Sequence, residues 1–297
     1  MRLPAALRRR LEASAHDLIQ GEARFDFAQP PGEPALTAPD SVSWRVFKNP
    51  LSLFIGGVAA VILELAEPRV RSGVWDHTTF RTDPVRRLRR TGLAAMVTVY
   101  GPRSGAEAMI AGIVRAHERV QGVTPAGEPY RASDPALLDW VHATAQFGFL
   151  QAYHRYVRPL PRQDRDRFYA EGAEAAALYG ATSPPGSEAG WAAMLEAMRG
   201  KLEPSDIVFE FLAIMRRAEV LPPALRPLQG LLIAAAVELT PGWVRGTLGL
   251  DRRFGLPPWA GPVLRAAGRA ADTIALRTAP PAQACLRLGL PADHLYR

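Results

Sequence analysis

The chain has 297 residues, of which 48% are hydrophobic and 22% charged, a composition typical of a folded globular protein and unlike that of a disordered one. The net charge of +7 comes almost entirely from arginine, since Lys48 and Lys201 are the only lysines, and charge alone does not indicate a nucleic-acid partner. The single cysteine, Cys285, excludes an internal disulfide and a Cys-based zinc or iron–sulfur site. A reducing, cytoplasmic compartment is the simplest expectation.

The N-terminal stretch has basic residues but lacks the apolar core and small-residue cleavage site of a signal peptide. The longest apolar run, at 51–66, is too short to span a bilayer and contains Glu64, so it predicts a buried helix and no integral membrane span. We expect a loosely packed N-terminal arm over residues 1–40 and one helical domain over residues 41–297.

The first strong helix signal is the segment 51–66. Asn49 provides an N-cap, Pro50 suits the first helical position, and Pro68 is expected to stop the helix. The segment "AMVTVY" at 95–100 is ambiguous between helix and strand, and no other run alternates long enough to demand a strand.

A second helix is predicted to open at Ser104, which forms a capping box with Glu107, and to close with Gly122 after its C-cap. Asp134 and Pro135 open a long helix that ends near residues 158–159. Proline and glycine clusters separate further helical stretches at about 162–179, 187–200, 204–218, 226–239 and 258–271. The sequence therefore predicts an all-α fold, a single multi-helix bundle.

His117 is the sharpest candidate for chemistry. Met109, Ile110, Ile113 and Val114 recur at helical spacing, and His117 occupies the next turn of that apolar stripe. Such a histidine is either a core residue hydrogen-bonded to a carbonyl or an axial ligand to haem iron, which needs a single imidazole in an apolar pocket. Periodicity does not choose between these two interpretations.

His142 also lies among apolar residues, so two helices each presenting one histidine would be able to hold a flat cofactor between them. Asp139 precedes His142 by three residues, as in di-iron bundles, but those sites need two such pairs, and the sequence offers one.

The basic stretch "FRTDPVRRLRRTG" contains five arginines followed by Thr91. It is either a solvated helix face or a source of guanidinium groups that pair with carboxylates such as haem propionates. Glu64 or Glu67, if buried, would have a raised pKa and would be able to accept a proton. The motifs of serine hydrolases, P-loop NTPases, dinucleotide-binding proteins and zincins do not occur.

Several segments taken together resemble a known family. These are "ILELAEPRVRSGVWDHTTFRTDPVRRLRRT", then "GIVRAHERVQGVTPAGEPYRASDPALLDWVHATAQFGFLQAY", then "EFLAIM" and the closing "RLGLPADHLYR". The chain resembles, over roughly residues 45–297, the bacterial proteins of the superfamily that includes rubber oxygenase (latex-clearing protein) and the ER-bound oxygenase of mycophenolic acid biosynthesis.

The resemblance implies an all-helical fold with a globin-like core around haem b. The characterised members cleave a carbon–carbon double bond of an isoprenoid chain with dioxygen, and their rubber substrate does not carry over to this chain. His117 in "VRAHERV" matches the histidine of the family pattern Arg-x-x-His-Ala-x-Val, while Arg115 lies one place closer than the family arginine. Arg87, Arg90 and Thr91 match Arg-x-x-Lys-Thr, with arginine in place of the lysine.

The resemblance implies His117 as the iron ligand, and Arg87, Arg90 and Thr91 as catalytic residues near the haem. From the residues themselves we add Glu64 as a catalytic base, Arg87 and Arg115 as cofactor contacts, and His142 as a further cofactor contact or as the iron ligand in place of His117. The expected function is a haem b-dependent oxygenase that acts with dioxygen on an apolar substrate, with isoprenoids as candidates; a homodimer is left open. The alternatives are a non-catalytic haem- or lipid-binding helical protein and a basic nucleic-acid-binding protein, which lacks helix-turn-helix spacing.

Overall fold

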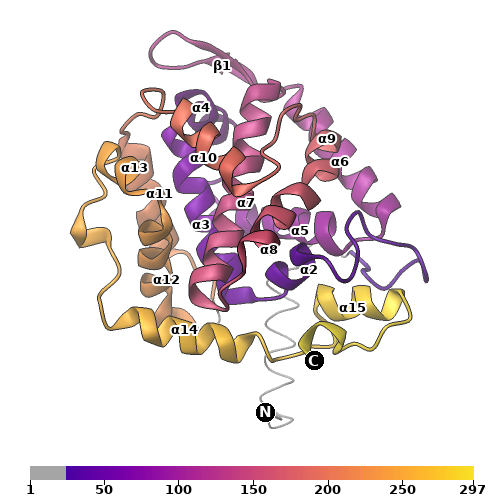
Figure 1. Ribbon diagram of the computed structural model, residues 1–297. Helices are drawn as coiled ribbons and strands as arrows, with labels where there is room; N and C mark the ends of the chain where they lie inside the picture. The colour runs from indigo at the N-terminus through magenta and orange to yellow at the C-terminus, as the bar shows by residue number, and fades with distance from the viewer. Residues whose placement is uncertain (1–24, 222) are drawn as a thin grey trace.

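The computed structural model describes residues 25–221 and 223–297, and its architecture is essentially all-α (Figure 1). The N-terminal half contains α2 (Val42–Phe47), α3 (Pro50–Ala66), α4 (Pro68–His77), α5 (Pro84–Tyr100), α6 (Arg103–His117) and a hairpin of β1 (Gln121–Val123) and β2 (Pro129–Arg131). The remaining helices are α7 (Pro135–Tyr156), α8 (Arg162–Glu171), α9 (Ala173–Tyr179), α10 (Glu188–Ala197), α11 (Asp206–Arg217), α12 (Arg226–Leu239), α13 (Gly242–Thr247), α14 (Ala260–Ala271) and α15 (Pro280–Arg287).

Helices α3 and α7 form the centre of the molecule, and their backbones come into contact at a pair of glycines. A Cβ atom on Gly56 would lie 2.7 Å from the carbonyl oxygen of Gly148, and a Cβ on Gly148 would collide with the carbonyl of Gly56. Only glycine allows two helix backbones to come this close. The contact fixes which faces of α3 and α7 remain available to other elements.

The predicted start of α3 is confirmed. The Asn49 side chain accepts hydrogen bonds from the backbone N–H groups of Leu51 and Ser52, and Pro50 occupies the first turn. The helix ends at Ala66, and Pro68 begins α4 after a bend of 110°. No single helix in the described part of the chain is long and apolar enough to cross a membrane, although the bent pair α3 and α4 would pass such a test together.

The predicted capping box of α6 is wrong. The helix begins at Arg103, and no side chain of its own caps it. Instead, the Glu33 carboxylate accepts hydrogen bonds from the backbone N–H and the hydroxyl of Ser104, at 2.6 and 3.0 Å. A distant carboxylate has replaced the local cap, because it satisfies the same free N–H group and complements the helix dipole.

Gly122 does not close the His117 helix, which ends at His117 itself. It lies in β1 opposite Tyr130 of β2, where a Cβ atom would lie 2.7 Å from the tyrosine hydroxyl oxygen. This short antiparallel hairpin was not predicted, because strands of three residues give too little alternation to detect.

Most other predicted helices are confirmed within a few residues, and "AMVTVY" is the end of α5. The stretch 162–179 is two helices, α8 and α9, which meet at Gly172. A Cβ atom on Gly172 would collide with the Gln146 amide and lie 3.0 Å from Nε2 of His142, so this junction sits directly on α7.

The start of α3 is also tied to the C-terminal part of the chain. The Lys48 ammonium pairs with the Asp272 carboxylate at 3.4 Å and donates a hydrogen bond to the carbonyl of Leu295 at 2.7 Å. Asp272 also accepts a hydrogen bond from the Tyr153 hydroxyl at 3.2 Å and pairs with Arg158 at 3.1 Å. Both Lys48 and Asp272 are buried, so this network joins α3, α7 and the C-terminal segment inside the protein.

Of the predicted N-terminal arm, residues 1–24 lie outside the described residues. Residues 25–40 contribute to the core through Phe27, Ala35 and Leu36, which are buried. The Arg287 guanidinium donates hydrogen bonds to the carbonyls of Phe27 and Glu33, at 2.6 and 2.8 Å.

Candidate active site

Four of the central helices each contribute one polar side chain to the same region of the protein. Glu64 on α3 and Thr144 on α7 are hydrogen-bonded, while Arg87 on α5 interacts electrostatically with both Glu64 and His117 at the end of α6. Helix α3 packs chiefly on α7, and α5 packs on α6. The site is therefore built between two helix pairs.

Glu64 is the acidic group of this site. Its carboxylate accepts a hydrogen bond from the Thr144 hydroxyl at 3.5 Å. Burial raises the pKa of Glu64 to about 7, while the positive charge of Arg87 and the hydrogen bond from Thr144 act in the opposite direction. A carboxyl group with this pKa can either hold or release a proton near neutral pH.

Glu64 does not stand in a closed core. It shares one face of α3 with Gly57 and Val61, at i, i+4 and i+7, and all three residues are half-buried although α3 is surrounded by other helices. Glu64 is thus a largely buried carboxyl group on a partly exposed face whose other two residues are apolar.

Arg87 carries the positive charge of the site. Burial lowers the pKa of its guanidinium, the nearby Glu64 carboxylate raises it, and Arg90 lowers it further. Within the described residues, no carboxylate lies within ion-pair distance of Arg87. A partly buried guanidinium without a direct partner is suited to binding an anionic group of a ligand.

His117 is half-buried at the last turn of α6. Burial and the positive charge of Arg87 lower the pKa of its imidazole, which favours the neutral form of the ring. Its Nδ1 atom is buried and has no hydrogen-bond partner among the described residues. One interpretation of the sequence was a core histidine that is hydrogen-bonded to a carbonyl group. At Nδ1, the structure shows no such bond within the described residues.

Three other predicted site residues lie at the protein surface. Arg90, Thr91 and Arg115 are all exposed, and the Thr91 hydroxyl donates a hydrogen bond to the carbonyl of Arg87 at 3.0 Å. This bond fixes the Thr91 side chain against its own helix. Arg90 is close enough to Arg87 to affect its pKa, while Arg115 makes no ion pair within the described residues.

Glu67, the alternative to Glu64, has a structural role. Its carboxylate caps α4 by accepting a hydrogen bond from the Val70 N–H at 2.7 Å and pairs with Arg69 at 2.8 Å. Both oxygens are engaged, which leaves Glu64 as the carboxyl group available to the site.

His142 lies in a different environment from Glu64. It is separated from Thr144 by two residues, or about 200° around α7, so the two side chains leave the helix on nearly opposite sides. The His142 ring packs near Gly172, and its buried Nε2 has no hydrogen-bond partner among the described residues. Burial lowers its pKa to about 4, although Asp139 acts in the opposite direction.

Asp139 does not form half of a di-iron site. Its carboxylate accepts hydrogen bonds from the backbone N–H groups of Thr182 and Ser183, both at 2.9 Å. In the described ranges, no three His, Cys, Asp or Glu side chains gather in a way that would hold a metal ion.

Sequence reasoning missed Thr144. It is a polar residue within the long apolar helix α7 and is fully buried, and this polarity was the only available signal. Its contact with Glu64 spans 80 residues of sequence, so no local pattern reveals it.

Comparison with protein-family models adds an independent finding. Residues 44–276 match the family described as ER-bound oxygenase mpaB/B'/rubber oxygenase, catalytic domain. The chain belongs to this family. Its oxygenase catalytic domain begins within α2, ends beyond α14 and includes Glu64, Arg87, His117 and Thr144. Comparison with curated proteins and with solved structures gave no match.

Proposed function

We propose that this member of the oxygenase family is a haem b-dependent oxygenase that uses dioxygen to oxidise an apolar substrate, with His117 as the axial ligand. The observation that carries the proposal is the half-buried imidazole of His117, whose buried Nδ1 has no hydrogen-bond partner among the described residues and whose ring lies in the electrostatic neighbourhood of Arg87.

The residues present fit haem better than a metal ion held by protein alone. The porphyrin provides four of the iron ligands, so one neutral imidazole suffices, whereas a protein-only site needs three or more ligating side chains. Such a group of side chains does not occur in residues 25–221 and 223–297. Arg87, which has no direct ion pair there, would hold a haem propionate.

When bound, haem would supply the redox chemistry that activates dioxygen. Glu64 would hold or accept a proton at its carboxylate, since its pKa of about 7 makes both forms accessible. Thr144 would orient that carboxylate through its hydrogen bond. The face formed by Gly57 and Val61 would contact the apolar substrate. An isoprenoid chain would be one such substrate.

The test is the visible spectrum of the purified protein, reconstituted with hemin and measured in the oxidised and reduced states. We expect a Soret band that His117→Ala abolishes or strongly shifts. His142→Ala is the matched control, because it removes another partly buried imidazole and should leave the band unchanged.

Oxygen consumption with candidate isoprenoids then separates an oxygenase from a haem- or lipid-binding carrier, which would show no oxygen-dependent turnover. We expect Glu64→Gln to bind hemin normally and to lose most of this turnover. A protein that remains featureless with hemin contradicts the haem assignment, and a spectrum that is lost in His142→Ala instead transfers the ligand role to that residue.

A further inference from the structure

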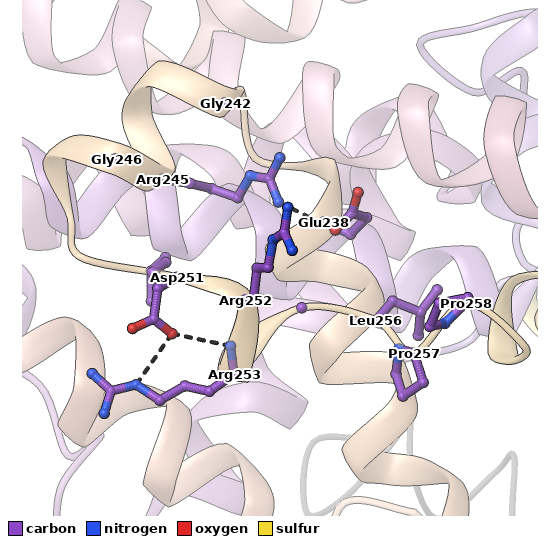
Figure 2. Close-up of a pocket in the computed structure, with 12 residues that line it drawn as sticks. Glu238, Gly242, Arg245, Gly246, Asp251, Arg252, Arg253, Leu256, Pro257 and Pro258 are labelled. Carbon is purple, nitrogen blue, oxygen red and sulfur yellow. Dashed lines mark hydrogen bonds and ion pairs between the residues drawn. The ribbon is translucent and has the colours of Figure 1, made fainter.

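A pocket of about 670 Å³ lies in the C-terminal part of the chain, and its lining residues belong to the end of α12, to α13 and to the loop that leads to α14 (Figure 2). None of the candidate active-site residues lines it. Its polar side chains are three arginines and two acids, and its apolar lining comes from Leu250, Leu256, Pro257 and Pro258. This combination of guanidinium groups and apolar surface is not explained by the proposed oxygenase reaction.

The positive charge of the pocket is not balanced by its acids. Glu238 is shared by two arginines, since one carboxylate oxygen pairs with Arg245 at 3.2 Å and the other with Arg155 at 3.6 Å. Asp251 pairs with Arg253 at 3.2 Å. Each carboxylate is therefore already engaged.

Arg252 is the surplus cation. Figure 2 shows its side chain extending toward Arg245 and Glu238, yet the structure gives it no ion pair within the described part of the chain. In addition, Nε of Arg245 is buried and has no hydrogen-bond partner there. Two adjacent guanidinium groups with unused donors are suited to a phosphoryl group, which offers several acceptor oxygens.

The helix that follows the pocket has an exposed face of unusual composition. Trp259, directly after Pro258, is 62% exposed, and Val263, one turn later, is 47% exposed. At 100° per residue, Trp259, Val263 and Ala266 lie on one half of the exposed face of α14, and Arg265 and Arg269 lie on the other half. Leu264 and Gly268 form the buried side.

Charge and exposed apolar groups thus occur together in one region. Residues 240–277 contain six arginines and two aspartates, with no lysine or glutamate. A tryptophan and a valine that project into water beside arginines are the residues that a peripheral protein uses at a bilayer, where apolar groups enter the interface and guanidinium groups attract anionic headgroups.

We propose that the arginine pocket and the exposed face of α14 together form a docking surface for a lipid bilayer that carries anionic phosphate headgroups. Arg252 and Arg245 bind a headgroup phosphate, Trp259 and Val263 enter the interface, and Arg265 and Arg269 contact neighbouring headgroups. The surface would bring an enzyme for apolar molecules to the phase in which such molecules dissolve, but its binding to lipid requires neither haem nor turnover.

The test is co-sedimentation of the full chain with vesicles of phosphatidylcholine, alone or mixed with phosphatidylglycerol. We expect binding to the mixed vesicles, weakened by added salt, and little binding to phosphatidylcholine alone. The double variant Arg252→Gln/Arg265→Gln should lower the partition coefficient by about tenfold or more, because each arginine near an anionic surface contributes to binding.

Two matched controls separate this surface from general charge and stickiness. Arg119→Gln/Arg131→Gln makes the same change in charge at exposed arginines near the hairpin, which lies at the other end of the molecule from α14 in Figure 1, and should leave binding unchanged. Val263→Ser should weaken binding, whereas Val123→Ser, at a valine that is 61% exposed in β1, should not.

Equal loss in the control variants overturns the assignment, as does equal binding to both kinds of vesicle. Saturation of the pocket by inorganic pyrophosphate without vesicle binding assigns it to a free anion and overturns the lipid proposal. Binding to a single-stranded oligonucleotide but not to vesicles assigns the surface to nucleic acid and likewise overturns it. The oxygenase proposal fails separately, through the hemin spectrum.

Discussion

Gly56 and Gly148 bring the backbones of α3 and α7 into direct contact, with a position for Cβ on Gly56 only 2.7 Å from the carbonyl oxygen of Gly148. Glu64 lies two turns beyond Gly56 on α3, and Thr144 lies one turn before Gly148 on α7. The glycine contact therefore sets the distance between the carboxylate and the hydroxyl of the candidate site, as well as the centre of the fold.

We expect Gly148→Ala to lower the free energy of unfolding by about 1 to 3 kcal/mol, because the new methyl group must push the two helices apart. The control is Gly57→Ala. Gly57 follows Gly56 in α3, and a Cβ atom on it would lie 3.8 Å from its nearest neighbour, in the Phe149 ring. That variant should be neutral or stabilising, since alanine favours a helix over glycine. Urea unfolding measures both, and equal destabilisation would contradict the role of the contact.

The raised pKa of Glu64 predicts a specific pH dependence of stability. The unfolded chain releases this proton near pH 4.5, while the folded protein holds it up to about pH 7. The contribution of Glu64 to the free energy of unfolding should therefore fall as the pH rises between these values, by about 1 to 3 kcal/mol. Glu64→Gln should lose this dependence, and Glu118→Gln, at an exposed position, should keep it. Denaturant unfolding at several pH values decides the point.

Arg87 should set the upper pH limit of the fall in stability that Glu64 causes. Its positive charge lowers the pKa of Glu64, so Arg87→Gln should raise that pKa above 7 and extend the fall in stability to higher pH. The same unfolding series, extended into the alkaline range, measures the change. An unchanged profile would mean that Arg87 is too far from Glu64 to act on it.

His142 should respond in the opposite direction. Burial lowers its pKa from 6.5 to about 4, so below pH 6.5 the unfolded chain takes up a proton that the folded protein refuses. Stability from this group is present above pH 6.5 and is lost as the pH falls toward 4. Between pH 6.5 and pH 4, the free energy of unfolding of His142→Gln should fall by about 1 to 3 kcal/mol less than that of the parent protein. His294→Gln, at an exposed position, should follow the parent curve.

Asp272 should be essential to stability. Asp272→Asn leaves the buried ammonium of Lys48 without its countercharge, which we expect to lower the free energy of unfolding by about 3 to 5 kcal/mol. The comparison is Glu219→Gln, which breaks the exposed pair between Arg226 and Glu219 and should cost less than about 1 kcal/mol. Similar effects from both variants would show that the Lys48 site is hydrated.

The helices could be predicted from the sequence because their caps and apolar periods are local. Asn49 with Pro50 and Asp134 with Pro135 mark true helix starts, and both side chains accept the expected backbone hydrogen bonds. The cap at Ser104 failed because its partner, Glu33, lies 71 residues away. A local pattern cannot show that a distant group has taken the place of a nearby one.

The candidate site was predictable in its residue types but not in its arrangement. His117, Arg87 and Glu64 each carry a recognisable signal, and the structure brings them into one electrostatic neighbourhood. The sequence could not separate Glu64 from Glu67, because the difference arises from the bend between α3 and α4, where Glu67 becomes a helix cap. Nor could it show that His142 leaves α7 on the side nearly opposite Thr144.

The hydrogen bond from Lys48 to the carbonyl of Leu295 joins positions 247 residues apart. Truncation of the chain after Asp293 would take away this acceptor and the Tyr296 ring, whose centroid lies 4.8 Å from the ammonium. Lys48, at the start of α3, would lose these contacts, and α3 packs directly on α7. The packing of residues 294–297 is therefore coupled to the start of the central helix α3.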